Sequence, residues 1–485
     1  MARRQLSTFE RLQEGRLNRK QRRELAHWIA AGDPRLEIVH RDAAGIDIGN
    51  ESHYVAVPPD RDPEPVQEFG SWTADLRRMA EWLQRCRIRT VAMQSTGVYW
   101  VAAYDVLRQA GLEVFLVNAR GTKNLPGRKS DVQECQWLMK LHSYGLLRNS
   151  FHPPEQIRAV RTVWRQRQRH VEEAGRAVQQ MQKALTKMNV QLANAISDLS
   201  GVTGLAIVRA IVSGERDPWK LAQLRDPHIQ ASEEEIAQSL EGRWQDDVLF
   251  ELAQVLEAYD FYQRQMAACE RKLGEYLKAL PTRELRSAQP ATEPPSASQR
   301  RKRRAKEARQ AKVCTSFDLA AELRRTTGVD LTTIDALSVL TAQTVVSELG
   351  PDLSAFPSEN HFTSWLKLTP QRDVSGGKVI RYSSPPVRNR VTNALRMAAE
   401  SLSHSDSYLG AKYRQLRARL GGRKAIKAMA RYLACLVYRL LTKGQAWVDR
   451  GAADYEHKSQ QRMLYSLNRK AAALGMRLVA AEATI

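Results

Sequence analysis

The stretch AAGIDIGNESHYVAVP, residues 43–58, decides what fold to expect in the first part of the chain. Residues 43–49 are short and apolar and carry one acid, Asp47, which is typical of a buried strand. Residues 52–58 alternate apolar and polar side chains, as a half-buried strand does. The Gly-Asn pair between the two segments suits a tight hairpin turn. The sequence therefore predicts an antiparallel strand pair with Asp47 close to the end of its first strand.

Further elements complete a familiar order. Apolar runs predict three more strands, at residues 65–71, 90–93 and 113–118, and helical spacing predicts helices at 75–86, 99–110 and 131–145. Ser130 stands where it can cap the last of these helices. The order β-β-β-α-β-α-β-α is that of the ribonuclease H-like fold. We therefore predict an α/β first domain of this kind, followed by long coiled-coil helices and a helical C-terminal domain.

A metal site is expected where these elements end. In VAMQSTGVYW, residues 91–100, the fourth strand ends at Gln94, a position that several nucleic-acid-cutting enzymes fill with a metal-binding carboxylate. Asp131 and Glu134 are three residues apart and share one helix face. Together with Asp47 they would hold two Mg²⁺ ions about 3.5–4 Å apart, which activate a nucleophile and stabilise a leaving oxygen. The alternative is that these acids only cap helices and face solvent.

A second interpretation of Asp47 is weaker. The motif GIDIG also opens actin-like ATPases and sugar kinases, in which the acid handles Mg-ATP. That interpretation requires a second glycine-rich phosphate loop and an adenosine motif, and neither is found in the right place.

The charge of the chain predicts a polyanionic partner. Its 485 residues include 75 Lys and Arg against 53 Asp and Glu, a formal net charge of +22, while 43% hydrophobic residues suffice for packed cores. Counterion release makes nucleic acid the favoured partner. A basic protein with solvated helices, or a membrane-surface protein, remains as the alternative.

Other classes of protein are disfavoured. The five cysteines are scattered without a CxxC pair, which argues against a zinc site or a disulfide framework. No apolar run approaches the roughly 18 residues of a membrane-spanning helix, and the N-terminus lacks the apolar core of a signal peptide. We therefore expect a cytoplasmic protein with no membrane partner.

The middle of the chain has two heptad seams. Apolar residues with alternating spacings of three and four fill positions 171, 174, 178, 181, 185, 188, 192 and 195. A second seam, broken at Gln263 and Glu270, uses positions 249, 252, 256, 259, 266, 273, 277 and 280. Ser232 and Glu235 could form a capping box. The seams predict an antiparallel coiled-coil hairpin or a dimerising pair, unless they pack internally as one helical domain.

The last part of the chain is basic and helical. Residues 286–312 are first Pro- and Ser-rich and then carry eight basic residues against one acid, which suits a phosphate-contacting linker or a solvated one. Residues 328–350 read as turn, helix, turn and helix, and resemble a phosphate-binding helix-hairpin-helix. A basic helix is expected at 388–401.

These observations predict six segments. They are a basic helical extension at 1–40, a catalytic α/β domain at 41–150, a coiled-coil region at 151–285, a linker at 286–312, a helical domain at 313–450 and a basic helical tail at 451–485.

Four stretches together resemble one family. AAGIDIGNESHYVAVP, VAMQSTGVYW, FLVNARGTKNLPGRKSDVQECQWLMKLHSYGLL and LKLTPQRDVSGGKV are similar to motifs of the DEDD transposases of the insertion-sequence one-ten type, especially the subgroup with an extended middle region. The resemblance covers roughly residues 40–450. It implies a RuvC-like N-terminal domain, a coiled coil and a C-terminal transposase domain. It also implies a recombinase guided by a structured bridge RNA that pairs with target and donor DNA.

The resemblance also implies roles for individual residues. Asp47, Asp131 and Glu134 match the first, third and fourth acids of the family, whose fourth is commonly Asp, and Gln94 stands where many members have Glu. Ser375 matches a serine that attacks DNA and works with the acids across a composite site. Without the resemblance, a Ser before two glycines would be read as a turn residue.

Gln94 raises the question of whether the site is active. An amide oxygen can still bind Mg²⁺ or a metal-bound water, so our hypothesis is a rewired site that works with three carboxylates. Several cations are expected near phosphates, in two groups along the chain: Arg128 and Lys129 before the last helix of the α/β domain, and Arg372, Lys378, Arg381, Arg388 and Arg390 around Ser375.

Three functions compete. The first is an RNA-guided transposase with a covalent Ser375–DNA intermediate. The second is a RuvC-like metal-dependent nuclease-transposase in which Ser375 is structural, and the third is a catalytically dead RNA- and DNA-binding regulator, suggested by Gln94. The heptad seams and the implied composite site favour a homodimer or a tetramer.

Overall fold

The structure is a computed structural model of the 485 residues. It describes residues 24, 37–95, 97–117, 130–284, 317–375, 378–383 and 389–444, together with short stretches between 461 and 477; in the strand pair of residues 371–375 and 378–383, only the side chain of Ile380 is included. The chain divides into two compact units, Met1–His152 and Pro153–Ile485. The predicted linker at 286–312 and nearly all of the predicted N-terminal extension and C-terminal tail lie outside the described residues.

The first unit is a mixed α/β structure around a five-stranded sheet. Its elements are β1 (Ala43–Ile48), β2 (Ser52–Ala56), β3 (Val66–Gly70), α3 (Thr73–Arg85), β4 (Thr90–Gln94), α4 (Trp100–Gln109), β5 (Glu113–Val117) and α6 (Asp131–Ser143). The strand order is β3-β2-β1-β4-β5. Strand β2 is antiparallel to both of its neighbours, β1 and β3, whereas β4 is parallel to β1 and β5 is parallel to β4. Every predicted strand and helix of this part is confirmed, with ends within two residues of those expected.

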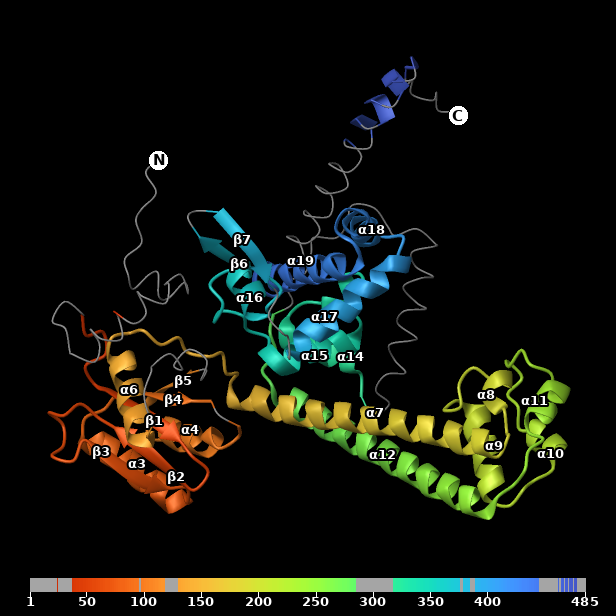
Figure 1. Ribbon diagram of the computed structural model, residues 1–485, viewed down its shortest axis with the longest axis horizontal. Coiled ribbons are helices and arrows are strands. Elements are labelled where there is room, and N and C mark those ends of the chain that lie inside the picture. Colours follow the sequence, from red (N-terminus) through yellow and green to blue (C-terminus); the bar gives the residue numbers. More distant parts are fainter. Residues whose placement is uncertain are drawn as a thin grey trace. The chain divides into compact units, whose positions relative to one another are not determined.

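The two faces of the sheet are covered by different helices. Successive residues of a strand point to opposite faces. Ile46 of β1 and Met93 of β4 pack with Met79 of α3 and Leu107 of α4 in one buried cluster. Helix α6 covers the other face, where it contacts β1, β2 and β4 (Figure 1).

The approach of α6 to the sheet depends on Gly45. A Cβ atom at Gly45 would come within 2.3 Å of the Cys135 carbonyl oxygen and 2.3 Å of the Met139 nitrogen, both in the helix backbone. The residues paired with Gly45 on the neighbouring strands are Ala56 and Ala92, both fully buried. A row of small residues therefore lets the helix backbone lie directly on β1.

The C-terminal end of α6 is fixed separately. The His142 ring bonds the Thr90 hydroxyl at 2.8 Å, and the Ser143 carbonyl accepts from the Val39 and His40 amides. Burial, with a smaller contribution from His40, lowers the pKa of His142 to about 4, so the ring is neutral at pH 7.

The second unit contains a long antiparallel helical hairpin. Helix α7 (Glu155–Lys187) packs along α12 (Asp246–Ala279). Lys187 pairs with Glu251 at 2.6 Å, while Arg167 pairs with Glu270 at 2.7 Å, which fixes the antiparallel direction. Four short helices close the far end: α8 (Leu192–Ala195), α9 (Val202–Val212), α10 (Pro218–Ala222) and α11 (Glu233–Ser239) (Figure 1).

The predicted seams correspond largely to buried positions. Met181, Leu185 and Leu252 are buried in a core that α7 and α12 share with the four short helices, so the hairpin and the internally packed domain both exist. The capping box of Ser232 and Glu235 is confirmed. Val171, the first seam position, is 40% exposed, and that assignment was wrong.

The remainder of the second unit is mainly helical. It contains α14 (Leu319–Thr327), the 3₁₀ helices η1 (Leu331–Thr333) and η2 (Leu402–His404), α15 (Val339–Leu349), α16 (Glu359–Trp365), β6 (Gln371–Ser375), β7 (Lys378–Ser383), α17 (Arg390–Ser401), α18 (Tyr408–Leu420) and α19 (Gly422–Lys443). Arg161 and Arg165 of α7 both pair with the buried Glu348 of α15, at 3.3 and 2.7 Å, which ties the helical hairpin to this part. Among the described helices, none has the length and apolar character to cross a membrane.

The expected helix-hairpin-helix is wrong in its first half. Residues 331–333 form only a 3₁₀ turn, capped by the Asp330 side chain, and Ala336 adopts a left-handed φ of 71°. A continuous α-helix cannot run through a left-handed residue. Only the second expected helix, α15, is present.

Replacing Gly45 with Ala should destabilise the first unit by about 1–3 kcal/mol, because the added methyl overpacks the contact with α6. The matched control is Gly175→Ala on the exposed face of α7, where a Cβ meets nothing within 4 Å and stability should rise by about 0.5–1 kcal/mol. Chemical denaturation measures both. Equal stability of Gly45→Ala and the native chain would contradict the close contact.

The Arg167–Glu270 pair yields a second prediction. Glu270 is 6% exposed and pairs with the similarly buried Arg167, so Glu270→Ala should cost about 3–5 kcal/mol by removing the carboxylate that balances a buried positive charge. The double variant Arg167→Met with Glu270→Leu should recover native stability or exceed it. Urea unfolding distinguishes the two, and a double variant as unstable as the single one would contradict this explanation.

Candidate functional site

The sheet brings Asp47 and Gln94 together near the C-terminal ends of the neighbouring parallel strands β1 and β4. Asp47 lies two residues beyond Gly45 on β1 and therefore on the face that α6 covers. Gln94 follows Met93, which is paired with Ile46 across the parallel strands, so it lies beside Asp47. Gln94 is 7% exposed, and Asp47 is half-buried. The Ser95 amide donates to the Val117 carbonyl at 3.0 Å, which holds this end of β4 against β5.

The first turn of α6 brings in the two remaining acids. The Ser130 side chain caps the helix by accepting from the Gln133 amide, as predicted, and Asp131 and Glu134 follow in the first turn. Their carboxylates are favoured there because the helix N-terminus is positive. The Gln94 side-chain amide donates to Glu134 Oε2 at 3.3 Å.

Two of the acids, Asp47 and Asp131, act on the thiol of Cys135 in the next turn of the helix. Burial raises its pKa to about 12, and the negative charges of Asp47 and Asp131 act in the same direction. Both carboxylates therefore act on a group in the second turn of α6. The four residues predicted from sequence thus gather around the N-terminal end of one helix.

The amide at position 94 changes the electrostatics of this group. A Glu at this position would face the Glu134 carboxylate at hydrogen-bonding distance, and two carboxylates that close repel unless a proton or cation lies between them. The Gln94 amide instead donates a hydrogen bond to Glu134. The Gln94–Glu134 pair is therefore stable without a metal ion.

The donor set suits a hard divalent cation, because all four residues can offer oxygen atoms, the ligands that Mg²⁺ prefers. Within residues 37–95 and 130–284 and the other described segments, however, no three His, Cys, Asp or Glu side chains lie close enough to hold a metal ion. The oxygen atoms of these residues are therefore the right type of ligand for Mg²⁺, but the carboxylates do not lie close enough together to coordinate a single ion.

Ser375 lies at the end of a hairpin in the second unit. It is the last residue of β6, and its backbone pairs with Lys378, the first residue of β7. The hairpin also places Arg381 opposite Asp373 and Arg372 opposite Tyr382, with an irregularity after Asp373. Ile380 of the same hairpin is 71% exposed.

The remaining predicted cations divide into two groups. Arg390 is the first residue of α17, next to the capping side chain of Asn389, and is half-buried. Arg128, Lys129 and Arg388 lie outside the described residues. The sequence-based predictions did not include the exposed cations of α18 and α19. These cations lie in the basic stretch YRQLRARLGGRK, residues 413–424, which the sequence shows directly.

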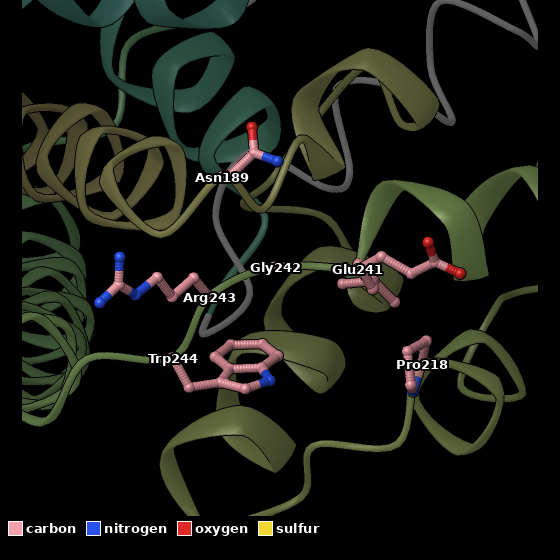
Figure 2. Close-up of a pocket in the computed structure, with 7 residues that line it drawn as sticks. Asn189, Pro218, Glu241, Gly242, Arg243 and Trp244 are labelled. Atoms are coloured by element: carbon pink, nitrogen blue, oxygen red, sulfur yellow. The ribbon is translucent and has the colours of Figure 1, made fainter.

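An open pocket of about 470 Å³ lies at the far end of the helical hairpin and contains none of these residues. Figure 2 shows Trp244, Arg243 and Glu241 on its wall, together with Asn189 and Pro218. Arg216 stacks on the Trp244 ring at 4.9 Å. The pocket mixes both charge signs and is separate from the candidate site.

Comparisons with known proteins identify the class. A family model for DEDD transposases of the IS110 type matches residues 44–190, and the model for the transposase IS116/IS110/IS902 family matches residues 330–414. The first range contains Asp47, Gln94, Asp131 and Glu134, and the second contains the Ser375 hairpin. The chain is therefore a DNA transposase or recombinase, and it carries two transposase domains of the IS110 type. No curated protein matches the chain.

Replacing Gln94 with Glu should make stability depend on Mg²⁺. Without metal, repulsion from Glu134 should lower the melting temperature below that of the native chain. With Mg²⁺, the added carboxylate should strengthen binding, so Mg²⁺ should raise the melting temperature more in the variant than in the native chain.

Thermal unfolding with EDTA and with millimolar Mg²⁺ measures both effects. The control is Gln133→Glu, in the same turn of α6 but exposed to solvent. The arrangement would be contradicted if Mg²⁺ did not raise the melting temperature of the Gln94→Glu variant, or if it raised that of the control equally.

Proposed function

We propose that this chain is a bridge-RNA-guided transposase of an insertion sequence, with a RuvC-like first unit and Ser375 as the nucleophile that attacks DNA. The convergence of β1, β4 and the N-terminal end of α6 carries the first half of the proposal, because it gathers Asp47, Gln94, Asp131 and Glu134 on one edge of a ribonuclease H-like sheet order. The two matched transposase domains support the second half.

The metal ions of the proposed reaction are Mg²⁺. Asp47, Asp131 and Glu134 would hold them, with Gln94 contributing its amide oxygen or a hydrogen bond. Bound Mg²⁺ would supply charge stabilisation at a DNA phosphate. Because Gln94 brings no charge, the site carries one negative charge less than four carboxylates, and we expect weaker metal affinity.

Ser375 would form the covalent intermediate. Its Oγ loses its proton as it bonds to a DNA phosphorus, one bridging P–O bond breaks, and the departing oxygen takes up a proton and leaves as a hydroxyl. A second DNA hydroxyl then attacks the same phosphorus, joins the new strands and returns the serine. A serine hydroxyl is a weak nucleophile and needs activation by a base or a metal.

The hairpin supports this role. Its register pairs Ser375, the last residue of β6, with Lys378, the first residue of β7. A cation at this position can stabilise the negative charge that develops on the phosphate. Arg372, Arg381, Arg388 and Arg390 are proposed to bind the neighbouring backbone, as are Arg128 and Lys129 in the first unit.

The remaining parts of the proposal concern partners. A structured RNA from the element's non-coding end would supply sequence specificity, donor and target DNA would be the substrates, and a homodimer or tetramer acting in the bacterial nucleoid would be the working form. The Gln94–Glu134 contact favours one rival, a catalytically dead regulator that binds RNA and DNA, since the contact needs no metal.

A trapping assay tests the proposal. Protein, RNA transcribed from the element's end, Mg²⁺ and labelled donor and target DNA are mixed and denatured, and protein–DNA adducts are counted on a gel. We expect an RNA-dependent adduct that disappears in Ser375→Ala and persists in Ser383→Ala, the control on the same hairpin. Asp47→Asn should reduce the adduct at least about 100-fold.

Two results would reject parts of this account. Strand cleavage abolished by Asp47→Asn but unaffected by Ser375→Ala would assign the chemistry to the first unit alone. Binding of RNA and DNA with neither cleavage nor adduct, restored to activity by Gln94→Glu, would show that the native site is dead.

A further inference from the structure

A large share of the chain's positive charge lies on its last three described long helices. Residues 389–444, which form α17, η2, α18 and α19, contain twelve Lys and Arg and two acids, a net +10 of the chain's +22. The far end of the helical hairpin has the opposite character: residues 189–250 contain five basic residues and ten acids. The positive charge is therefore distributed unevenly along the chain and is not a uniform covering of solvated side chains.

The cations at the junction of α18 and α19 are exposed to solvent. Arg417, Arg419, Arg423 and Lys424 are all exposed, and in the part of the chain that the structure describes no carboxylate pairs with any of them. These four residues are called the junction cations below. The nearby Arg414 donates to the Ser405 carbonyl oxygen at 2.7 Å and so helps to hold the start of α18.

Two of the junction cations occupy an unfavourable position for folding. Arg423 and Lys424 lie in the first turn of α19, where the helix dipole is positive and cations destabilise the helix. No side chain caps this helix. Gly421, at φ 76°, and Gly422 leave open space, since a Cβ atom at either would meet nothing within 4 Å.

Like charges also meet between neighbouring helices. The pKa of Lys427 on α19 is lowered by burial and by the charge of Arg396 on α17. Such crowding reduces the stability of the folded state, so it indicates a surface that binds a polyanion.

We propose that the junction cations form a second nucleic-acid contact that grips the phosphate backbone of a duplex without reading bases. Four cations on one exposed helix junction, with glycines that keep side chains out of the way, match a phosphate-binding surface. The inference rests on the proposed function only for the nature of the polyanion. Residues 417–424 lie outside both ranges matched by the family models.

The contact is tested by removing charge from the full-length protein. The test variant is Arg423→Gln with Lys424→Gln, and the matched control is Arg264→Gln with Arg271→Gln, which removes the same charge from exposed positions on α12. Fluorescence anisotropy measures binding of two mixed-sequence probes, a DNA duplex and an RNA duplex of about 30 base pairs each, over a range of salt concentrations.

We expect the test variant to bind about tenfold more weakly or worse at about 0.1 M salt, with the slope of log affinity against log salt reduced by about two. Its melting temperature should stay equal or rise, because repulsion is relieved, which excludes misfolding as the cause. The control should leave affinity for both probes within about twofold of the native chain.

The probes identify the source of the phosphates. Loss for the RNA duplex alone assigns the surface to guide RNA, loss for the DNA duplex alone assigns it to substrate DNA, and loss for both indicates backbone binding of either; each result supports the proposal. Unchanged affinity for both probes, or an equal loss in the control, overturns it. No strand cleavage is involved, so failure of the Ser375 mechanism would leave this result intact.

Discussion

Backbone contact between α6 and β1 at Gly45 is the constraint on which the first unit depends. The helix rests on a row of small residues, Ala56, Gly45 and Ala92, that runs across three strands. A larger side chain in this row would push α6 away from the sheet. Because Asp131 and Glu134 form the first turn of that helix, the same contact sets their distance from Asp47 and Gln94.

Gln94 gives this site a different resting state from one built of four carboxylates. Carboxylates that face one another need a cation or a proton between them, whereas an amide and a carboxylate can pair directly. The hydrogen bond from Gln94 to Glu134 therefore stabilises the metal-free form of the site, while the missing carboxylate lowers its affinity for metal ions. A rewired site would bind Mg²⁺ mainly when a DNA phosphate adds its own negative charge.

Charge is also divided along the second unit. The far end of the helical hairpin is acidic, the α17–α19 helices are basic, and the buried Glu348 ties α7 to α15 between them through Arg161 and Arg165. Taking buried cations out of water lowers the pKa of Arg161 to about 10, with Glu348 acting in the opposite direction. This clamp gives the hairpin a fixed attachment to the part of the unit that carries Ser375.

The sequence was sufficient for features that depend on local pattern. Alternation and helical spacing predicted the strands and helices of the first unit, and the spacing of three residues placed Asp131 and Glu134 on one face. Contacts between residues far apart in the chain could not be predicted from the sequence. Glu270 was interpreted as a break in a heptad seam, yet it is buried and forms an ion pair with Arg167. The left-handed Ala336 ruled out the expected helix before α15, a backbone state that residue type does not reveal.

Identifying the residue that carries DNA in the intermediate tests the central claim most directly. A denatured reaction would be digested with nuclease and protease, and mass spectrometry would locate the residue that retains a nucleotide through a phosphodiester link. The account predicts that nucleotide on Ser375, in reactions that contain both the RNA and Mg²⁺. Completed strand transfer with no nucleotide-bearing residue, or with the nucleotide on another residue, would contradict it.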